Sequence, residues 1–292
     1  MTRAAVVLMA YGSPETLADV PAYYADIRGG RPVAPEHLAD LVERYRRLGI
    51  EERNPLNAIT EQTRAALEAE LGLPVLTGMR HWTPRIAEAA ERALAGGAET
   101  VVGLVLAPHY SALSIGKYRA LLEDAVGGRA EIRFVERWGS EPAFVEYVAE
   151  RLRGTDAHVV FTAHSLPARI VAEGDPYEDE LLESARLVAE EGGIDEWTFA
   201  YQSASPTGEP WLGPDVVEHL EHLHARAVER VLVCPLGFVS DHLEIAWDID
   251  TEARTKAQEL GMELTRTPMP NADPAFVSVL ASLVGRELGV LR

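Results

Sequence analysis

Short apolar runs alternate along the whole chain with amphipathic stretches of helical period. The apolar runs cover 4–10, 73–78, 100–107, 131–136, 158–163, 197–202, 230–236 and 262–267. Helical patterns lie between them, for example at 60–71, 84–96 and 214–227. Strands that are apolar at successive positions are typical of parallel sheets covered on both faces by helices. The alternation therefore predicts an α/β fold of doubly wound parallel sheets.

The two halves of the chain echo each other. The first strand runs into AYGSP at 10–14, and the strand at 158–163 runs into AHSLP at 163–167. We infer two similar α/β halves, residues 1–153 and 154–292. Ligands of parallel α/β sheets bind beyond the carboxyl ends of the strands, so we expect one cleft between the halves. The groups expected around it are Tyr11, His164 and the loops at 108–114, 202–213 and 236–244.

Composition and charge restrict the class of partner. The chain has 292 residues, of which 47% are hydrophobic and 25% charged, as is typical of a globular protein. No window approaches the roughly 18 continuous apolar residues of a membrane span, so stable membrane insertion is not expected. The formal charge of −19 repels nucleic acid. An anionic small molecule needs a local cluster of arginines to bind.

Cys234 is the single cysteine of the sequence. Neither a disulfide nor a cysteine-ligated iron–sulfur cluster can therefore be built within one chain. The N-terminal stretch lacks the small-residue cleavage site of a signal peptide, and we interpret it as a first buried strand. These features predict a cytoplasmic protein without a tightly bound cofactor.

His164 directly follows a buried strand, where its ring can face the cleft. A neutral imidazole suits a divalent metal or a proton-accepting role near neutral pH. For an isolated histidine, a strand-end residue bonded to backbone is the competing interpretation.

Three carboxylates recur at every fourth position in the segment 241–252, namely Glu244, Asp248 and Glu252. On a helix they form one acidic stripe, and like charges at that spacing cost helix stability. Such a cost indicates a use, for example moving cations or protons. A solvated acidic face on a strongly acidic protein is the alternative.

Arginines gather around aromatic residues near the N-terminus. Arg28 and Arg31 flank a Gly pair in YYADIRGGRP, and RYRR follows at 44–47. Such clusters suit a flat ligand with carboxylates, through bidentate hydrogen bonds and stacking. Arginines on a solvated helix surface give the same pattern.

Together these segments resemble the ferrochelatase family over nearly the whole chain. AHSLP and GFVSDHLE in this order, separated by the YQS…WLGPD loop, form a specific signature. The matching pieces are AYGSP (10–14), YYADIRGGRP (23–32), LAPHYS (106–111), AHSLP (163–167), GDPY (174–177), YQS…WLGPD (201–215) and GFVSDHLE (237–244).

The resemblance implies two chelatase-like halves around a porphyrin cleft, with His164 and Glu244 as the inner pair for the metal and the pyrrole protons. It implies that Asp248 and Glu252 continue an acidic path outwards. Tyr11 in AYGSP is similar to the bacterial coproporphyrin-type subgroup, in which this residue is an axial ligand to the product iron. By the same matching, the porphyrin contacts fall on Tyr11, Arg28, Arg44, Tyr45, Asn54 and Tyr118. Asn54 stands where the subgroup often has Ser, and it can still donate a hydrogen bond.

The predicted reaction is the insertion of Fe(II), as a substrate, into coproporphyrin III to give coproheme for haem biosynthesis. The alternatives are a protoporphyrin ferrochelatase, another tetrapyrrole chelatase and a non-enzymatic haem carrier. The apolar lip segments of the membrane-associated protoporphyrin enzymes are not found in the sequence. A carrier has no need of the acidic stripe. We expect a monomer that hands its product transiently to a downstream enzyme of the haem pathway.

Overall fold

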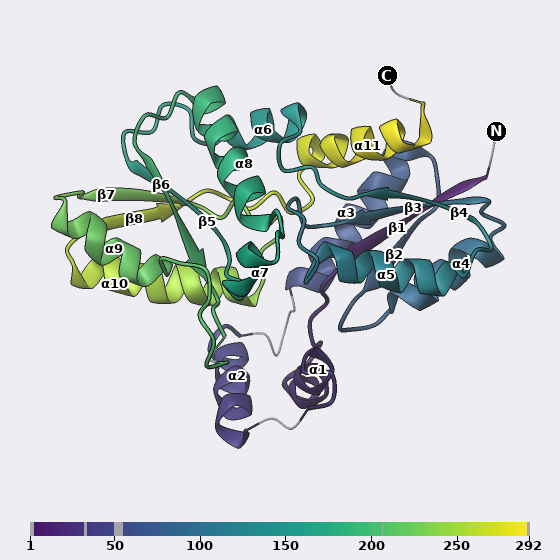
Figure 1. Ribbon diagram of the computed structural model, residues 1–292, viewed down its shortest axis with the longest axis horizontal. Helices are drawn as coiled ribbons and strands as arrows, with labels where there is room; N and C mark the ends of the chain where they lie inside the picture. Colours follow the sequence, from purple (N-terminus) through teal and green to yellow (C-terminus); the bar gives the residue numbers. More distant parts are fainter. Residues whose placement is uncertain (1–2, 32–33, 50–54, 206, 291–292) are drawn as a thin grey trace.

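Two four-stranded parallel sheets form the two halves of the protein (Figure 1). The computed structural model describes residues 3–31, 34–49, 55–205 and 207–290. All eight predicted strands are present, with ends within two residues of the prediction. They are β1 (Ala4–Ala10), β2 (Val75–Met79), β3 (Thr100–Val105), β4 (Glu131–Val135), β5 (His158–His164), β6 (Trp197–Gln202), β7 (Arg230–Cys234) and β8 (Glu263–Arg266).

The strand order is the same in the two sheets, β2-β1-β3-β4 in one and β6-β5-β7-β8 in the other. The order reverses beside β1 in the first sheet and beside β5 in the second, and this is where doubly wound sheets bind ligands. Tyr11 follows β1 directly and His164 is the last residue of β5. The predicted fold of two similar doubly wound halves is confirmed.

Helices cover both faces of each sheet, and their apolar sides complete the buried cores. Asp215 and Asp273 cap two of them by accepting hydrogen bonds from backbone N–H groups of the first turn. The helices are α1 (Val20–Ile27), α2 (Pro35–Arg47), α3 (Pro55–Leu71), α4 (Ile86–Ala95), α5 (Ile115–Val126), α6 (Pro142–Ala149), α7 (Arg169–Ala172), α8 (Tyr177–Gly192), α9 (Val216–Ala225), α10 (Arg254–Glu259) and α11 (Pro274–Leu288), with a 3-10 turn η1 (Leu17–Asp19).

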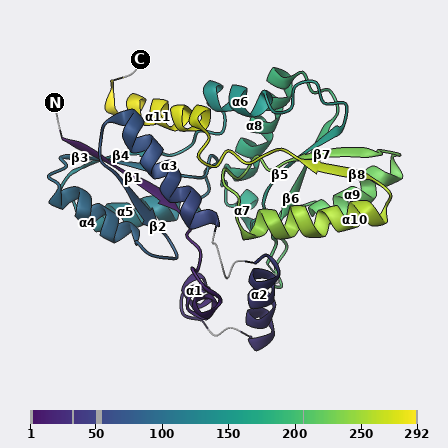
Figure 2. The same ribbon diagram turned by 180° about the vertical axis from the view of Figure 1, so that it is seen from behind.

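Two helices, α6 and α11, pack across the boundary between the halves, which we call the seam (Figures 1 and 2). α6 precedes the predicted boundary at 153/154 but packs against α8, and α11 at the C-terminal end packs against α3, β3 and β4 of the first sheet. Phe276 of α11 lies in one buried cluster with Trp138 and Phe144, so a continuous core spans the seam. This shared core fixes the position of one sheet relative to the other.

The acidic segment after β7 differs from the regular helix that the fourfold spacing suggested. It forms a π-helix, η2 (Ile245–Ala253), which continues into α10. The hydroxyl of Thr251 donates to the carbonyl of Ala246, five residues earlier, at 2.8 Å. Arg266 on β8 binds both Asp241 and Asp250, and so holds the two ends of the segment against the sheet. π-helices are rare and are often found at functional sites.

Candidate active site

His164 and Glu244 form an ion pair at the carboxyl end of β5. Nε2 of His164 lies 3.5 Å from Oε1 of Glu244, and Nδ1 contacts the carbonyl of Ser165. Glu244 is the residue before η2, and its other oxygen lies 3.5 Å from Nε2 of His242. The carboxylate is therefore held between two imidazoles, of which only His164 was singled out from the sequence.

Two opposing effects set the protonation of this pair. Burial alone would lower the pKa of His164, but the adjacent Glu244 carboxylate outweighs it and raises that pKa to about 9. Burial would likewise raise the pKa of Glu244, whereas the imidazolium charge holds it well below the usual range. The resting pair is thus an imidazolium and a carboxylate at neutral pH.

Asp248 lies on η2, at the next position of the fourfold spacing after Glu244, and is buried, with 7% of its surface exposed. Gln202 Nε2 donates to its Oδ2 at 3.3 Å, and the hydroxyl of Ser203 donates to the same oxygen. Burial and the charge of Glu244 raise the pKa of Asp248 to about 6. Gln202 at the end of β6 and Ser203 just after it therefore hold this carboxylate, at the start of the loop expected at the cleft.

Glu252 is exposed at the outer side of η2. Its Oε1 accepts a hydrogen bond of 2.7 Å from the indole N–H of Trp247. The three carboxylates of the predicted stripe thus run from a half-exposed position beside His164, through a buried one, to solvent. Because Gln202 and Ser203 cover Asp248, the three carboxylates do not form one solvated face.

Tyr11 stands over a carboxylate–imidazole pair in the first half. Its ring is 40% exposed and lies 4.6 Å, centroid to centroid, from the ring of His81. His81 Nδ1 is 2.8 Å from Oδ2 of Asp26, and Arg85 binds the same carboxylate through two nitrogens. Burial raises the pKa of Tyr11, and the Glu244 carboxylate raises it further. The second half approaches this region at Leu243, which precedes Glu244 and packs against the cluster of Tyr23 and Tyr45.

The sequence did not single out His81, although it lies two residues beyond the end of β2 and His164 lies at the end of β5. A ring residue just beyond a strand end is the signal that could have found it. Its partner Asp26 is 55 residues away along the chain.

The predicted porphyrin contacts differ in how much surface they present. Tyr45 is 2% exposed and shares a hydrogen bond of 3.1 Å with Ser13, and Tyr118 is 4% exposed beneath the guanidinium of Arg80. Arg44 lies over the ring of Trp247, with 5.1 Å from Cζ to the ring centroid. Arg28 has a buried Nε without a hydrogen-bond partner among the described residues. Asn54 lies outside the described residues.

The loop at 108–114, expected around the cleft, makes hydrogen bonds across to the second half, but its histidine is buried. Ser111 Oγ and the N–H of Ala112 both donate to Asp175. His109 is 3% exposed and packs against Gly139, and burial lowers its pKa to about 3. The histidine of LAPHYS is therefore a neutral interior group, because the seam between the halves covers it.

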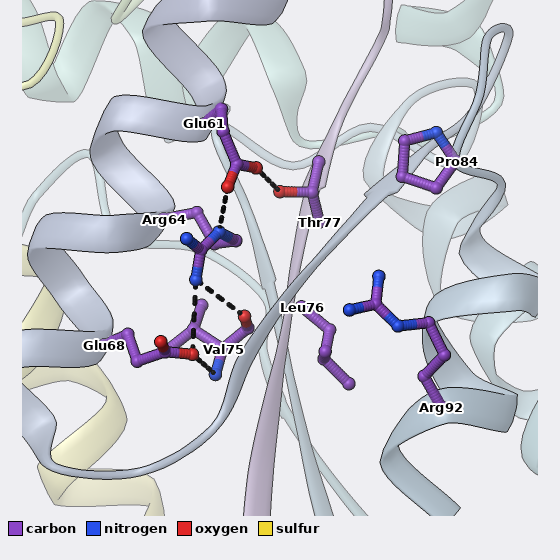
Figure 3. Close-up of a pocket in the computed structure, with 8 residues that line it drawn as sticks. All are labelled: Glu61, Arg64, Glu68, Val75, Leu76, Thr77, Pro84 and Arg92. Atoms are coloured by element: carbon purple, nitrogen blue, oxygen red, sulfur yellow. Dashed lines mark hydrogen bonds and ion pairs between the residues drawn. The ribbon is translucent and has the colours of Figure 1, made fainter.

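A separate pocket of about 270 Å³ lies on the outer side of the first half, between α3, β2 and α4 (Figure 3). Its charged side chains are Glu61, Arg64, Glu68 and Arg92, so their formal charges balance. Arg64 pairs with Glu61 at 2.5 Å and with Glu68 at 3.2 Å. This pocket holds none of the residues predicted to act on metal or porphyrin.

The arrangement suits a metal ion in transit. In the described ranges, no three or more His, Cys, Asp or Glu side chains are grouped as a metal site. His164 and Glu244 supply one nitrogen and one carboxylate donor, which leaves further positions of a metal ion open to another ligand. Such a pair can bind a metal ion and release it to another ligand. One member is protonated and the other is not, as a proton-transfer site requires.

Comparison with known proteins identifies the family. The family profile described as Ferrochelatase matches residues 3–288. This chain belongs to the ferrochelatase family. It is accordingly a metal chelatase of the class that inserts iron into porphyrins.

Close relatives cover almost the full length of the chain. A ferrochelatase of Deinococcus radiodurans is 41% identical, with 97% of this chain and 95% of the relative covered. A ferrochelatase of Herpetosiphon aurantiacus is 42% identical, with 97% and 98% covered. A coproporphyrin III ferrochelatase of Anoxybacillus flavithermus is 40% identical, with 97% and 96% covered.

Solved structures of other chelatases share the fold. SirB from Bacillus subtilis with Fe3+ superposes with a TM-score of 0.60 at 13% identity, covering 98% of this chain and 96% of SirB. CbiX, described as the terminal enzyme for siroheme biosynthesis in denitrifying bacteria, gives 0.54 at 13% identity, covering 97% and 98%. Among the described helices, none is long and apolar enough to cross a membrane.

Proposed function

We propose that this ferrochelatase inserts Fe(II) into coproporphyrin III and releases coproheme for haem biosynthesis. The observation that carries the proposal is the His164–Glu244 pair at the switch point of the second sheet. The neighbouring Leu243 packs against the cluster of Tyr23 and Tyr45 in the first half. The relative from Anoxybacillus flavithermus is named for coproporphyrin III, whereas those from Deinococcus and Herpetosiphon are named only ferrochelatase. The porphyrin therefore has to be tested.

Arginines support a substrate with several carboxylates. Arg28 brings a buried Nε that has no partner among the described residues, and a buried guanidinium nitrogen gains most from a charged acceptor. Arg44 is stacked on Trp247, which leaves donors at the edge of its guanidinium for a carboxylate. Four propionates engage these side chains more fully than two.

The reaction replaces two pyrrole protons with one Fe(II). His164 is protonated while paired with Glu244, so it has to release that proton before it accepts one from a pyrrole nitrogen. Fe(II) approaching Glu244 repels the imidazolium charge and lowers the pKa of His164, which frees the ring as a base. The released protons pass to Asp248, whose pKa of about 6 suits exchange with solvent by way of Glu252.

Iron is a substrate in this scheme and not a resident cofactor. Cys234 is buried and is the single cysteine of the sequence, so we propose an enzyme without an iron–sulfur cluster. A cytoplasmic location, a monomeric state and transient transfer of coproheme to a downstream enzyme remain part of the proposal.

Turnover with Fe(II) under anaerobic conditions tests the proposal. We expect a higher kcat/KM for coproporphyrin III than for protoporphyrin IX, measured side by side with the same enzyme preparation. A clear preference for protoporphyrin IX would overturn the choice of porphyrin but not the chelatase activity. Absence of insertion into either porphyrin would overturn the proposed reaction.

A further inference from the structure

Trp247 contacts side chains from two parts of the candidate site. It lies on η2, and its indole N–H donates to Oε1 of Glu252 at 2.7 Å. The face of its ring carries the guanidinium of Arg44, with Cζ 5.1 Å from the ring centroid. Arg44 comes from α2, which lies with α1 on one side of the seam between the sheets in both views (Figures 1 and 2).

A stacked arginine is well prepared to bind a carboxylate. The contact with Trp247 uses the flat face of the guanidinium and leaves the N–H groups at its edge pointing sideways. Nε of Arg44 already donates to Asp40 at 2.9 Å, which leaves the terminal nitrogens for a ligand. A side chain held in its binding orientation loses less conformational freedom when the ligand arrives.

We propose that Trp247 is a positioning residue that holds Arg44 ready for a carboxylate of the porphyrin, and that Glu252 fixes the orientation of Trp247. This inference rests on the proposed function, because it takes Arg44 as a porphyrin ligand. One indole then links the outer carboxylate of the acidic path to the porphyrin contact. A change at Glu252 should therefore weaken porphyrin binding even when no metal is present.

Titration with metal-free coproporphyrin III tests the first link, with Kd read from the porphyrin absorbance. Trp247→Leu removes the aromatic face, and we expect binding to weaken about 3- to 10-fold, the range of a partly exposed cation–π contact. Trp247→Phe keeps a smaller face and should lie between wild type and Trp247→Leu. In an Arg44→Met background, Trp247→Leu should cause no further loss, because the two residues act as one unit.

The second link is tested with Glu252→Ala in the same metal-free titration. We expect roughly 2- to 5-fold weaker binding in the wild-type background, since Trp247 loses the hydrogen bond that orients it. No loss is expected in the Trp247→Leu background.

Phe134→Leu is the matched control for Trp247→Leu, because it removes an aromatic ring under Arg119, 5.6 Å from the guanidinium carbon, at the outer side of the first half. Its Kd should equal that of wild type.

Each outcome decides between explanations. An equal loss from Trp247→Leu with and without Arg44 would show that Trp247 acts through its own contacts, and would overturn the inference. Unchanged binding in Arg44→Met would remove Arg44 from the porphyrin contacts and the inference with it, while iron insertion measured by turnover could still stand. An effect of Glu252→Ala that persists without Trp247 would overturn the link to the acidic path.

Discussion

Tyr11 and His164 occupy equivalent positions in the two halves of the protein. Tyr11 follows β1 and His164 ends β5, and these strands hold the same place in two sheets of identical strand order. Each ring is accompanied by a carboxylate–imidazole pair, Asp26–His81 in one half and Glu244 with His164 itself in the other. The two equivalent positions thus carry different groups, because a phenol follows one strand and the imidazole of an ion pair ends the other.

Removing the imidazole of His164 should stop iron insertion without unfolding the protein. We expect His164→Ala to lower kcat by two orders of magnitude or more, within the range of roughly 10²–10⁴ for a general base. His224→Ala is the control, since His224 is exposed on α9. Turnover and thermal unfolding of both variants check this. Near-normal turnover of folded His164→Ala would remove His164 from the mechanism.

The His164–Glu244 pair also predicts how stability depends on pH. The pKa of His164 is about 9 in the folded protein, above the unfolded value of roughly 6.5, so its stabilisation is complete below the unfolded value and is lost as pH rises through about 9. Because the pair is partly exposed, solvent screening limits the effect to about 1 kcal/mol.

Glu244→Gln should abolish this part of the pH dependence. Without the carboxylate, burial keeps the pKa of His164 low, and no stabilisation remains to be lost between neutral and alkaline pH. The measurement is the free energy of unfolding from urea titrations at several pH values. Curves for wild type and Glu244→Gln that run parallel from pH 6 to 10 would contradict the ion pair.

The pKa of Asp248 predicts a separate step in the pH dependence of kcat. Its pKa is about 6, so it is a carboxylate above that pH and a neutral acid below it. We expect kcat of the wild type to fall as pH decreases through about 6, because a protonated Asp248 cannot accept protons from the site. Asp248→Asn should lower kcat and lose this step, while Glu252→Gln, at the exposed end of the path, should keep it. An identical pH profile in wild type and Asp248→Asn would exclude Asp248 from proton transfer.

Much of the fold could be predicted from the sequence because burial on both faces of a parallel strand leaves a continuous apolar run. Tyr11 and His164 were found by the same route, as ring residues at strand ends. The packing of α11 on the first sheet could not be predicted, since an apolar helix face does not say which sheet it covers. For the same reason, the sequence did not predict that α6 and α11 pack across the seam.

The geometry around Glu244 required the structure. A fourfold spacing of carboxylates fits both an α-helix and a π-helix, and the choice depends on contacts such as Arg266 with Asp241 and Asp250. Trp247 was visible in the sequence, but the guanidinium that stacks on it belongs to Arg44 on α2, about two hundred residues earlier in the chain. Long-range pairs of this kind leave no periodic signal in one sequence.

Tyr11 should matter for the product more than for insertion. Its exposed side chain lies in the first half, at the position equivalent to that of His164 in the second, and we expect it to meet the iron after insertion. A phenolate prefers Fe(III) to Fe(II) by charge, and the raised pKa of Tyr11 means that the phenol stays protonated until a metal displaces the proton. An interaction made only with the product does not stabilise the transition state of insertion.

We therefore expect Tyr11→Phe to keep the rate of Fe(II) insertion within about tenfold of wild type, since a product ligand need not contribute to the barrier. The ferric product complex should show a changed visible spectrum and faster release of coproheme, both measurable with the same preparation. His81 and Asp26 remain in place in this variant, which confines the change to the phenol oxygen. An unchanged ferric spectrum would show that Tyr11 is not the axial ligand. Complete loss of insertion would place Tyr11 in the chemical step, and the division of labour between the two switch points would then be wrong.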